Sequence, residues 1–218
     1  MPKFFPNIFG KEFVHTFVES IYSIIKINFF FNLTLLPWII LNLFLKFTSE
    51  TMVLYLLVGL LLYPAIKTFF SVDAKFVTFK EYFRTWKQNL FSSLIFGVVC
   101  NLLIGLLLGE LLIVLSQKQL YFLTPVFMFA LMFATVLVLH MLRMKPVGLW
   151  KQNSKTAVFL SVRYVFQTLL IFGLFVMFLG IYYIFPYLNL VLTGSVLLTA
   201  INFLIEKVWT KMIAIKET

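Results

Sequence analysis

Few residues of this 218-residue chain carry side chains that could do chemistry, and they are scattered. Glu110, His140 and Glu206 stand near the ends of long apolar segments, whereas Asp73 and Glu81 lie in a polar segment between two of them. An ionisable side chain within a membrane marks an ion or substrate path. None stands in the middle of an apolar segment here, which argues against coupled ion transport by the chain alone.

The residue types also fail to assemble into a catalytic or metal-binding motif. No nucleophile stands with a positioned base, no carboxylates are paired, and no Gly-rich phosphate loop is present. Cys100 is the single cysteine, so neither an intrachain disulfide nor a CxxC metal site is available. We interpret His140 as a partly hydrated histidine near Arg143. The sequence therefore predicts a non-enzymatic protein without a cofactor or a bound metal.

A stripe of small and polar residues is the most informative pattern. It repeats every four residues and consists of Ser93, Gly97, Asn101, Gly105 and Gly109. Residues at this spacing share one face of a helix, and small ones let a second helix approach closely, with Gly105 and Gly109 forming a GxxxG pair. Asn101 is suited to an interhelical hydrogen bond. Two partners stay open: another helix of the same chain, or a helix of another membrane protein.

The elements that must carry this stripe follow from the composition. Hydrophobic residues make up 62% of the chain and charged residues 12%, and 28 residues are Phe. A water-soluble domain is typically about 25% charged and 45–50% apolar, because its surface must be solvated. The mean hydropathy of +1.02 also excludes a disordered chain. We therefore expect an all-α, polytopic integral membrane protein.

Charged residues divide the chain into apolar segments that match the length of a membrane span, which is about 20 residues. The sequence predicts six transmembrane helices in one domain, at residues 27–45, 51–66, 88–109, 119–142, 164–185 and 190–205. They are preceded by an N-terminal segment, residues 1–26, and followed by a tail, residues 206–218. Longer loops cover residues 67–87 and 143–163. The helices should pair as three hairpins, and Pro37 should kink the first span. The polar residues of that span (Asn28, Asn32, Thr34 and Asn42) imply that one of its faces is buried against protein.

The distribution of Lys and Arg predicts the orientation. Of the 18 basic residues, 16 fall in the two termini and the two longer loops, and only Lys46 and Lys118 lie in the opposite connections. Short cytoplasmic loops are enriched in Lys and Arg. Both termini should therefore be cytoplasmic. The net charge of +10 is explained by this topology, so no nucleic-acid binding is expected.

The predicted cytoplasmic segments have a basic amphipathic pattern. In residues 67–87, the aromatics Phe79, Phe83 and Trp86 recur at helical spacing, while Arg84 and Lys87 occupy other positions. Such helices lie at the level of the lipid headgroups and bind anionic lipids. Residues 1–26 and 149–163 have the same character. The chain should thus consist of three units, each an interfacial helix followed by a transmembrane hairpin.

Several short motifs resemble the YesL-type family of Gram-positive bacterial integral membrane proteins. The most specific runs from Glu81 to Asn89 and contains Phe83, Arg84, Trp86, Lys87 and Asn89. It is similar to the family pattern F-F-x-x-[FW]-[KR]-x-N, with Tyr82 in place of the first Phe. The other matches are Asn32-Leu33, Leu36-Pro37, Tyr63-Pro64-Ala65, Phe185-Pro186 and Gly194.

The resemblance implies a location in the bacterial cell membrane and a role in sugar uptake, since such proteins are typically encoded beside carbohydrate ABC importers. The leading hypothesis is an accessory subunit that binds the transmembrane permease of such an importer. A facilitator or channel for a small neutral solute is one alternative. A lipid-binding membrane scaffold that uses the basic aromatic helices is another.

Overall fold

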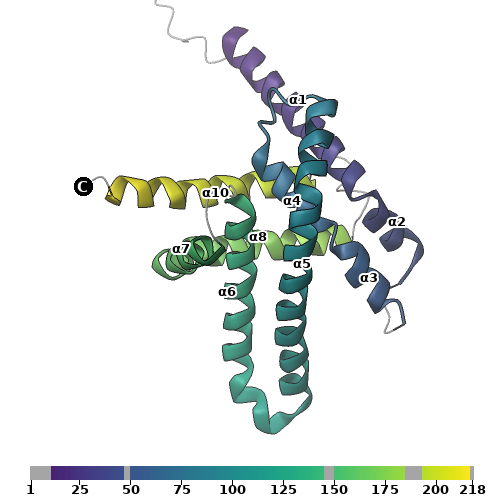
Figure 1. Cartoon of the computed structure of the whole chain (residues 1–218), viewed down its shortest axis with the longest axis vertical. Helices are drawn as coiled ribbons and strands as arrows, with labels where there is room; N and C mark the ends of the chain where they lie inside the picture. Colours follow the sequence, from purple (N-terminus) through teal and green to yellow (C-terminus); the bar gives the residue numbers. More distant parts are fainter. Residues whose placement is uncertain (1–10, 47–49, 145–149, 185–192, 217–218) are drawn as a thin grey trace, which may run out of the picture.

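The computed structural model describes residues 11–46, 50–144, 150–184 and 193–216, and every regular element in these ranges is a helix. The all-α prediction is confirmed for them (Figure 1). The elements in chain order are α1 (Lys11–Thr34), α2 (Leu36–Phe44), α3 (Met52–Gly59), α4 (Leu62–Ser71), α5 (Phe79–Ser116), η1 (Lys118–Leu123), α6 (Thr124–Arg143), α7 (Trp150–Arg163), α8 (Val165–Ile184) and α10 (Thr193–Lys216).

Four helical stretches of the described residues are long and apolar enough to cross a membrane. They are Val53–Ser71, Phe79–Ser116, Lys118–Arg143 and Val165–Ile184. Large apolar side chains on them are exposed, among them Leu102, Leu106, Phe129 and Phe166. An exposed apolar surface of this extent is rare on a water-soluble monomer and is satisfied by lipid. The protein is therefore a multi-pass membrane protein.

The first predicted span is broken. The stretches His15–Thr34 and Leu36–Phe44 meet at an angle of 70°, and only the two together are long and apolar enough to cross a membrane. Pro37 stands in the first turn of α2, where its missing N–H is not needed. The expected kink is thus confirmed, and it separates two helices at Leu35. Asn28, Asn32 and Thr34 are buried, which confirms that the polar face of this segment packs against protein.

Counting the bent pair as one span gives five spans among the described residues, so six are not confirmed. The predicted sixth segment, residues 190–205, begins outside the described residues, and its remainder forms the first half of α10. This helix continues through Glu206 and Lys207, beyond the predicted end of the span. The predicted Phe185-Pro186 turn also lies outside the described residues.

The interfacial segments are mostly continuous with the spans that follow them. Residues 79–87 form the first turns of α5, a helix of 38 residues, or about 57 Å at 1.5 Å per residue. A hydrocarbon core is about 30 Å thick, so α5 extends well beyond it. A capping box fixes its start, since the Thr78 hydroxyl accepts from the Glu81 N–H at 3.3 Å and the Glu81 carboxylate accepts from the Thr78 N–H at 2.9 Å. Among the described residues, α7 alone forms a helix separate from the hairpin that follows it, which is the arrangement predicted for all three units.

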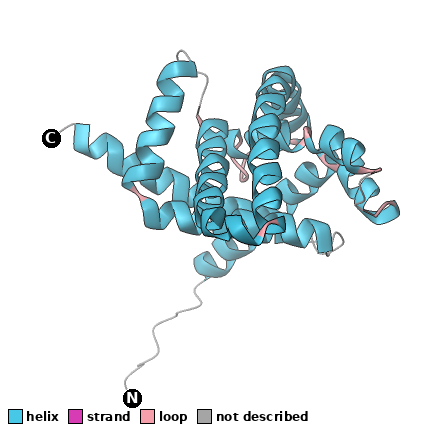
Figure 2. Ribbon diagram, turned by 90° about the horizontal axis from the view of Figure 1, so that it is seen from below, coloured by secondary structure: helices cyan, strands magenta, loops and turns pink. Residues whose placement is uncertain are grey.

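The α8/α10 hairpin runs across the α5/α6 hairpin instead of alongside it (Figure 1). Figure 2, seen from below, looks along the α5/α6 hairpin, with the other helices spread to both sides. One membrane normal cannot run along both hairpins. A bundle of three aligned hairpins is therefore not confirmed.

The core lies where α1, α4, α8 and α10 meet. The ring of Phe31 lies 5.6 Å from that of Phe69 and 6.2 Å from that of Phe178, measured between centroids. Beside these rings, the buried Tyr182 hydroxyl donates to Asn32 Oδ1 at 2.6 Å. One turn earlier on α1, Asn28 Oδ1 accepts from the Ser195 backbone N–H at 3.2 Å. Two asparagines of α1 thus fix the positions of α8 and α10.

Removing the Tyr182 hydroxyl should destabilise the protein. In Tyr182→Phe the ring stays in place but Asn32 loses a buried donor, and polar interhelical bonds in membranes are worth about 0.6 kcal/mol on average and about 1.7 at most. We expect a lower midpoint of thermal unfolding in detergent, followed by intrinsic fluorescence. Tyr121→Phe, at an exposed tyrosine, is the matched control and should unfold like the parent. Equal midpoints for both variants would contradict this assignment.

Candidate functional site

The first half of the predicted stripe is covered by the chain itself. Ser93 and Gly97 of α5 are buried, and a Cβ atom added to Gly97 would lie 2.6 Å from Cδ2 of Tyr63. Real Cβ atoms essentially never approach another heavy atom so closely. Glycine is therefore required at this position by the close approach of α4 to α5.

Tyr63 is held on this glycine by two neighbours. Its hydroxyl donates to Asn101 Oδ1 at 2.6 Å, and its ring makes an edge contact with Phe96, with centroids 6.2 Å apart. Tyr63 stands in the first turn of α4, just after the interruption between α3 and α4. The hydrogen bond expected of Asn101 is thus made within the chain.

The second half of the stripe is open. A Cβ atom added to Gly105 or to Gly109 would meet nothing within 4 Å. The neighbouring Leu102 and Leu106 are exposed, so this part of α5 lies at the lipid-facing surface. The two halves of one periodic pattern therefore have different surroundings, and only the GxxxG half is free to take a further helix.

Gly105 also lines a cavity of about 480 Å³. The cavity is formed by residues of α2, α3, α4, α5, α6 and α8. Its walls include Trp38, Tyr55, Leu56, Gly59, Leu62, Tyr63, Ile66, Asn101, Ile104, Gly105, Leu108, Leu131, Thr135, Val138, Leu139, Leu142, Phe172, Phe175, Val176, Leu179 and Tyr183. Trp38 closes one side, where it packs on Gly59 and makes an edge contact with Tyr55.

The cavity is lined mostly by apolar side chains, and several of its polar groups are engaged within the chain. Asn101 and Tyr63 bond each other, the Thr135 hydroxyl donates to the Leu131 carbonyl at 2.8 Å, and the Tyr55 hydroxyl donates to the Leu45 carbonyl at 2.7 Å. A sugar has many hydroxyls, each of which needs a partner when it leaves water. The cavity is thus suited to aliphatic or aromatic groups and poorly suited to a sugar.

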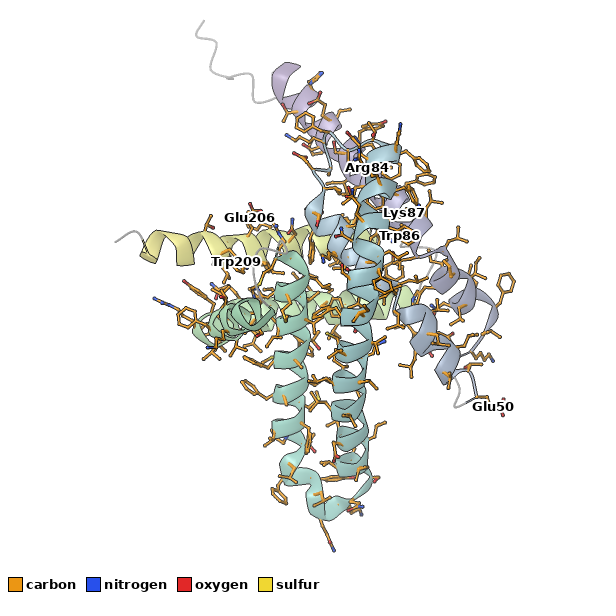
Figure 3. The ribbon with its side chains drawn as sticks, viewed as in Figure 1. Glu50, Arg84, Trp86, Lys87, Glu206 and Trp209 are labelled. Carbon is orange, nitrogen blue, oxygen red and sulfur yellow. The ribbon has the colours of Figure 1, made fainter. Side chains whose placement is uncertain are left out.

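The basic aromatic motif of α5 divides into a packed face and a free face. Tyr82 is fully buried, and its ring lies 5.5 Å from that of Phe30 on α1. Phe83 and Trp86 are half-buried and lie 6.3 Å apart, and Asn89 is half-buried as well. Arg84 and Lys87 are exposed (Figure 3). Tyr82 therefore joins the motif to α1, and the two cations stay exposed for contact with anionic lipid headgroups.

The remaining candidates are not brought together. No group of three or more His, Cys, Asp or Glu residues in the described ranges is placed to hold a metal ion. His140 is only 1% exposed, so the expectation of a partly hydrated histidine is wrong. It is buried because α4, α7, α8 and α10 all pack on α6.

Sequence reasoning missed Tyr63 as the residue that covers the stripe. The signal was a tyrosine in an apolar segment, since a buried Tyr hydroxyl needs a partner and Asn101 was the polar group available in another span. The cavity left no such signal, because its lining comes from six helices.

Comparisons with known proteins add no assignment: the chain matches no protein-family model, no curated protein and no solved structure. The YesL-type resemblance stays a prediction.

Adding one methyl group should distinguish the two halves of the stripe. Gly97→Ala places a Cβ against the held ring of Tyr63, and overpacking of this kind destabilises by about 1–3 kcal/mol. Gly105→Ala enters open space and should be neutral or slightly stabilising, since Ala favours helix over Gly. Thermal unfolding of both variants in detergent measures the difference. A Gly97→Ala protein as stable as Gly105→Ala would show that α4 does not press on this glycine.

Proposed function

We propose that the protein is a non-enzymatic accessory subunit that binds a transmembrane helix of a partner membrane protein. The observation that carries this proposal is the open half of the stripe, Gly105 and Gly109, beside the apolar cavity of about 480 Å³. Small residues at this spacing allow the backbones of two helices to approach, and close packing is the main force that joins helices in lipid.

The chain's own packing provides a precedent for this docking mode. On the same face of α5, Tyr63 of α4 already fills the space above Gly97. A partner helix along Gly105 and Gly109 would repeat this contact two turns further on, with a large apolar side chain directed into the cavity. The cavity walls would contact this side chain on several sides. An exposed helix face without a cavity would contact it on one side only.

The resemblance to the YesL-type family supports the identity of the partner, the permease of a carbohydrate ABC importer. It also supports a location in the bacterial cell membrane. The distribution of basic residues supports cytoplasmic termini. Anionic lipids would contact Arg84 and Lys87, which are exposed at the start of α5.

A facilitator for a small neutral solute is the alternative, and the cavity is the feature that favours it. Its apolar walls and engaged polar groups fit a permeant sugar poorly. A lipid-binding scaffold would use Arg84 and Lys87. This function would leave the cavity and the two open glycines without a role.

Gly105→Leu should prevent partner binding without unfolding the protein. The leucine enters open space in the isolated chain but blocks close approach of a second helix. We expect the amount that copurifies with a tagged importer permease from native membranes to fall by about tenfold or more. A loss of about 1.4 kcal/mol of packing energy between the two helices weakens their binding tenfold. Thermal stability of the isolated protein should be unchanged.

Leu106→Phe is the matched control, because Leu106 is exposed on another face of the same turn. It should copurify as the parent does. Recovery of the parent protein without any permease would overturn the proposal. Sugar flux into liposomes containing the purified protein alone would favour the facilitator instead.

The proposed orientation is testable at the two ends of α5. In a Cys100→Ala background, Lys118→Cys should react with a membrane-impermeant thiol reagent added to intact cells, whereas Lys80→Cys should react only after the cells are opened. Both lysines are exposed, so burial would not mask the result. Labelling is read as a mass shift on gels. The reverse pattern would place the termini outside.

A further inference from the structure

Polar residues gather where α10 crosses the end of α6, away from the apolar cavity. Arg143 Nη2 of α6 lies 3.9 Å from Glu206 Oε2 of α10. His140 stands one turn before Arg143, and Asn202 and Trp209 stand one turn before and after Glu206. Figure 3 shows Glu206 and Trp209 beside this end of α6. We call these five residues the α6/α10 polar cluster.

Three nitrogen atoms of the cluster are buried without a hydrogen-bond partner among the described residues. They are Nε of Arg143, Nε1 of Trp209 and Nδ1 of His140. His140 is 99% buried, so water does not reach it from the surface. A buried polar group left unpaired destabilises a protein, and more so when it is charged, so native structures rarely leave several together. All three residues lie within one helical turn of the Arg143–Glu206 contact, and this placement points to a ligand.

The chemistry of these atoms defines that ligand. Arg Nε and Trp Nε1 can only donate, and His Nδ1 donates in one of its tautomers. The one acceptor, Asn202 Oδ1, also lacks a described partner, and turning the amide over would present its NH2 group instead. A ligand that pairs these donors must therefore offer several acceptor oxygens.

The charge balance at the cluster favours an anion. Arg143 is positively charged and mostly buried, while Glu206 is largely exposed and at the limit of ion-pair distance. An exposed carboxylate so far away compensates a buried guanidinium weakly. Phosphate combines negative charge with several oxygens, and Arg is the side chain that best matches it.

We propose that the α6/α10 polar cluster binds the phosphate group of an anionic phospholipid headgroup. The end of an apolar helix such as α6 lies at the depth where headgroups begin, and tryptophan is enriched at that level. The site is separate from the proposed docking surface, because the cavity is lined by Leu139 and Leu142 on a different face of α6. It is also separate from Arg84 and Lys87 at the start of α5.

Lipid retention tests this site. The delipidated full-length protein is placed in mixed micelles containing phosphatidylglycerol or phosphatidylcholine, and bound lipid is counted by native mass spectrometry. A third arm adds inorganic phosphate and follows thermal unfolding. We expect retention of phosphatidylglycerol over phosphatidylcholine and no stabilisation by millimolar inorganic phosphate.

The variants separate the cluster from general surface charge. Arg143→Gln and Trp209→Phe should each reduce phosphatidylglycerol retention, Arg143→Gln by about tenfold, since hydrogen bonds to charged groups are stronger than those between neutral groups. Glu206→Gln should raise it by removing the opposing charge. Lys207→Gln removes the same charge as Arg143→Gln from an exposed position of α10 and should have little effect.

If Arg143→Gln fails to fold, two milder variants keep the test valid. Arg143→Lys preserves the positive charge, and Trp209→Phe preserves an apolar ring. Equal retention of the two lipids, or equal losses in Arg143→Gln and Lys207→Gln, would overturn the proposal. If inorganic phosphate stabilises the protein and neither lipid is retained in preference, the proposal of a lipid headgroup is overturned. The cluster would then bind a free anion. Normal permease binding in these variants would leave the proposed function unaffected.

Discussion

The need to pair every polar group inside an apolar environment determines how the helices of this protein meet. A buried amide or hydroxyl has no water to bond with in lipid, so it requires a partner within the protein, and three asparagines of this chain find theirs on another helix. Asn32 accepts from Tyr182, Asn28 accepts from the Ser195 backbone, and Asn101 accepts from Tyr63. These three contacts join α1 to α8, α1 to α10 and α4 to α5. The aromatic rings of Phe31, Phe69 and Phe178 pack around the first of them.

The same rule explains why two surfaces of the protein differ in what they can bind. The cavity beside Gly105 is lined mostly by apolar side chains, and Asn101 and Tyr63 bond each other there, so it offers mainly apolar contact. The α6/α10 polar cluster has the opposite character, with donors buried and unpaired among the described residues. A hydrophobic helix fits the first surface, and an acceptor-rich anion fits the second. Helix α6 contributes a different face to each, which allows lipid binding and partner binding to be tested separately.

Continuity of the helices gives the basic aromatic motif a structural role. Because α5 starts at Phe79 with a capping box and runs unbroken to Ser116, it is longer than the hydrocarbon core is thick. Tyr82 then packs on Phe30 of α1, and Arg84 and Lys87 are left exposed. The motif thus contacts α1 through Tyr82, while its two cations remain exposed.

Properties local to a segment could be inferred from the sequence alone. Hydropathy and charge located the apolar helices, Pro37 marked the bend at Leu35, and four-residue spacing placed Ser93 to Gly109 on one face of α5. Only the tertiary structure decided which half of that face is covered. Helix α4 brings Tyr63 against Gly97, whereas Gly105 and Gly109 stay uncovered. The crosswise α8/α10 hairpin and the burial of His140 were likewise invisible in the sequence. Both result from contacts between residues distant in the chain, such as Asn32 with Tyr182 and Arg143 with Glu206, which no periodicity within one segment can specify.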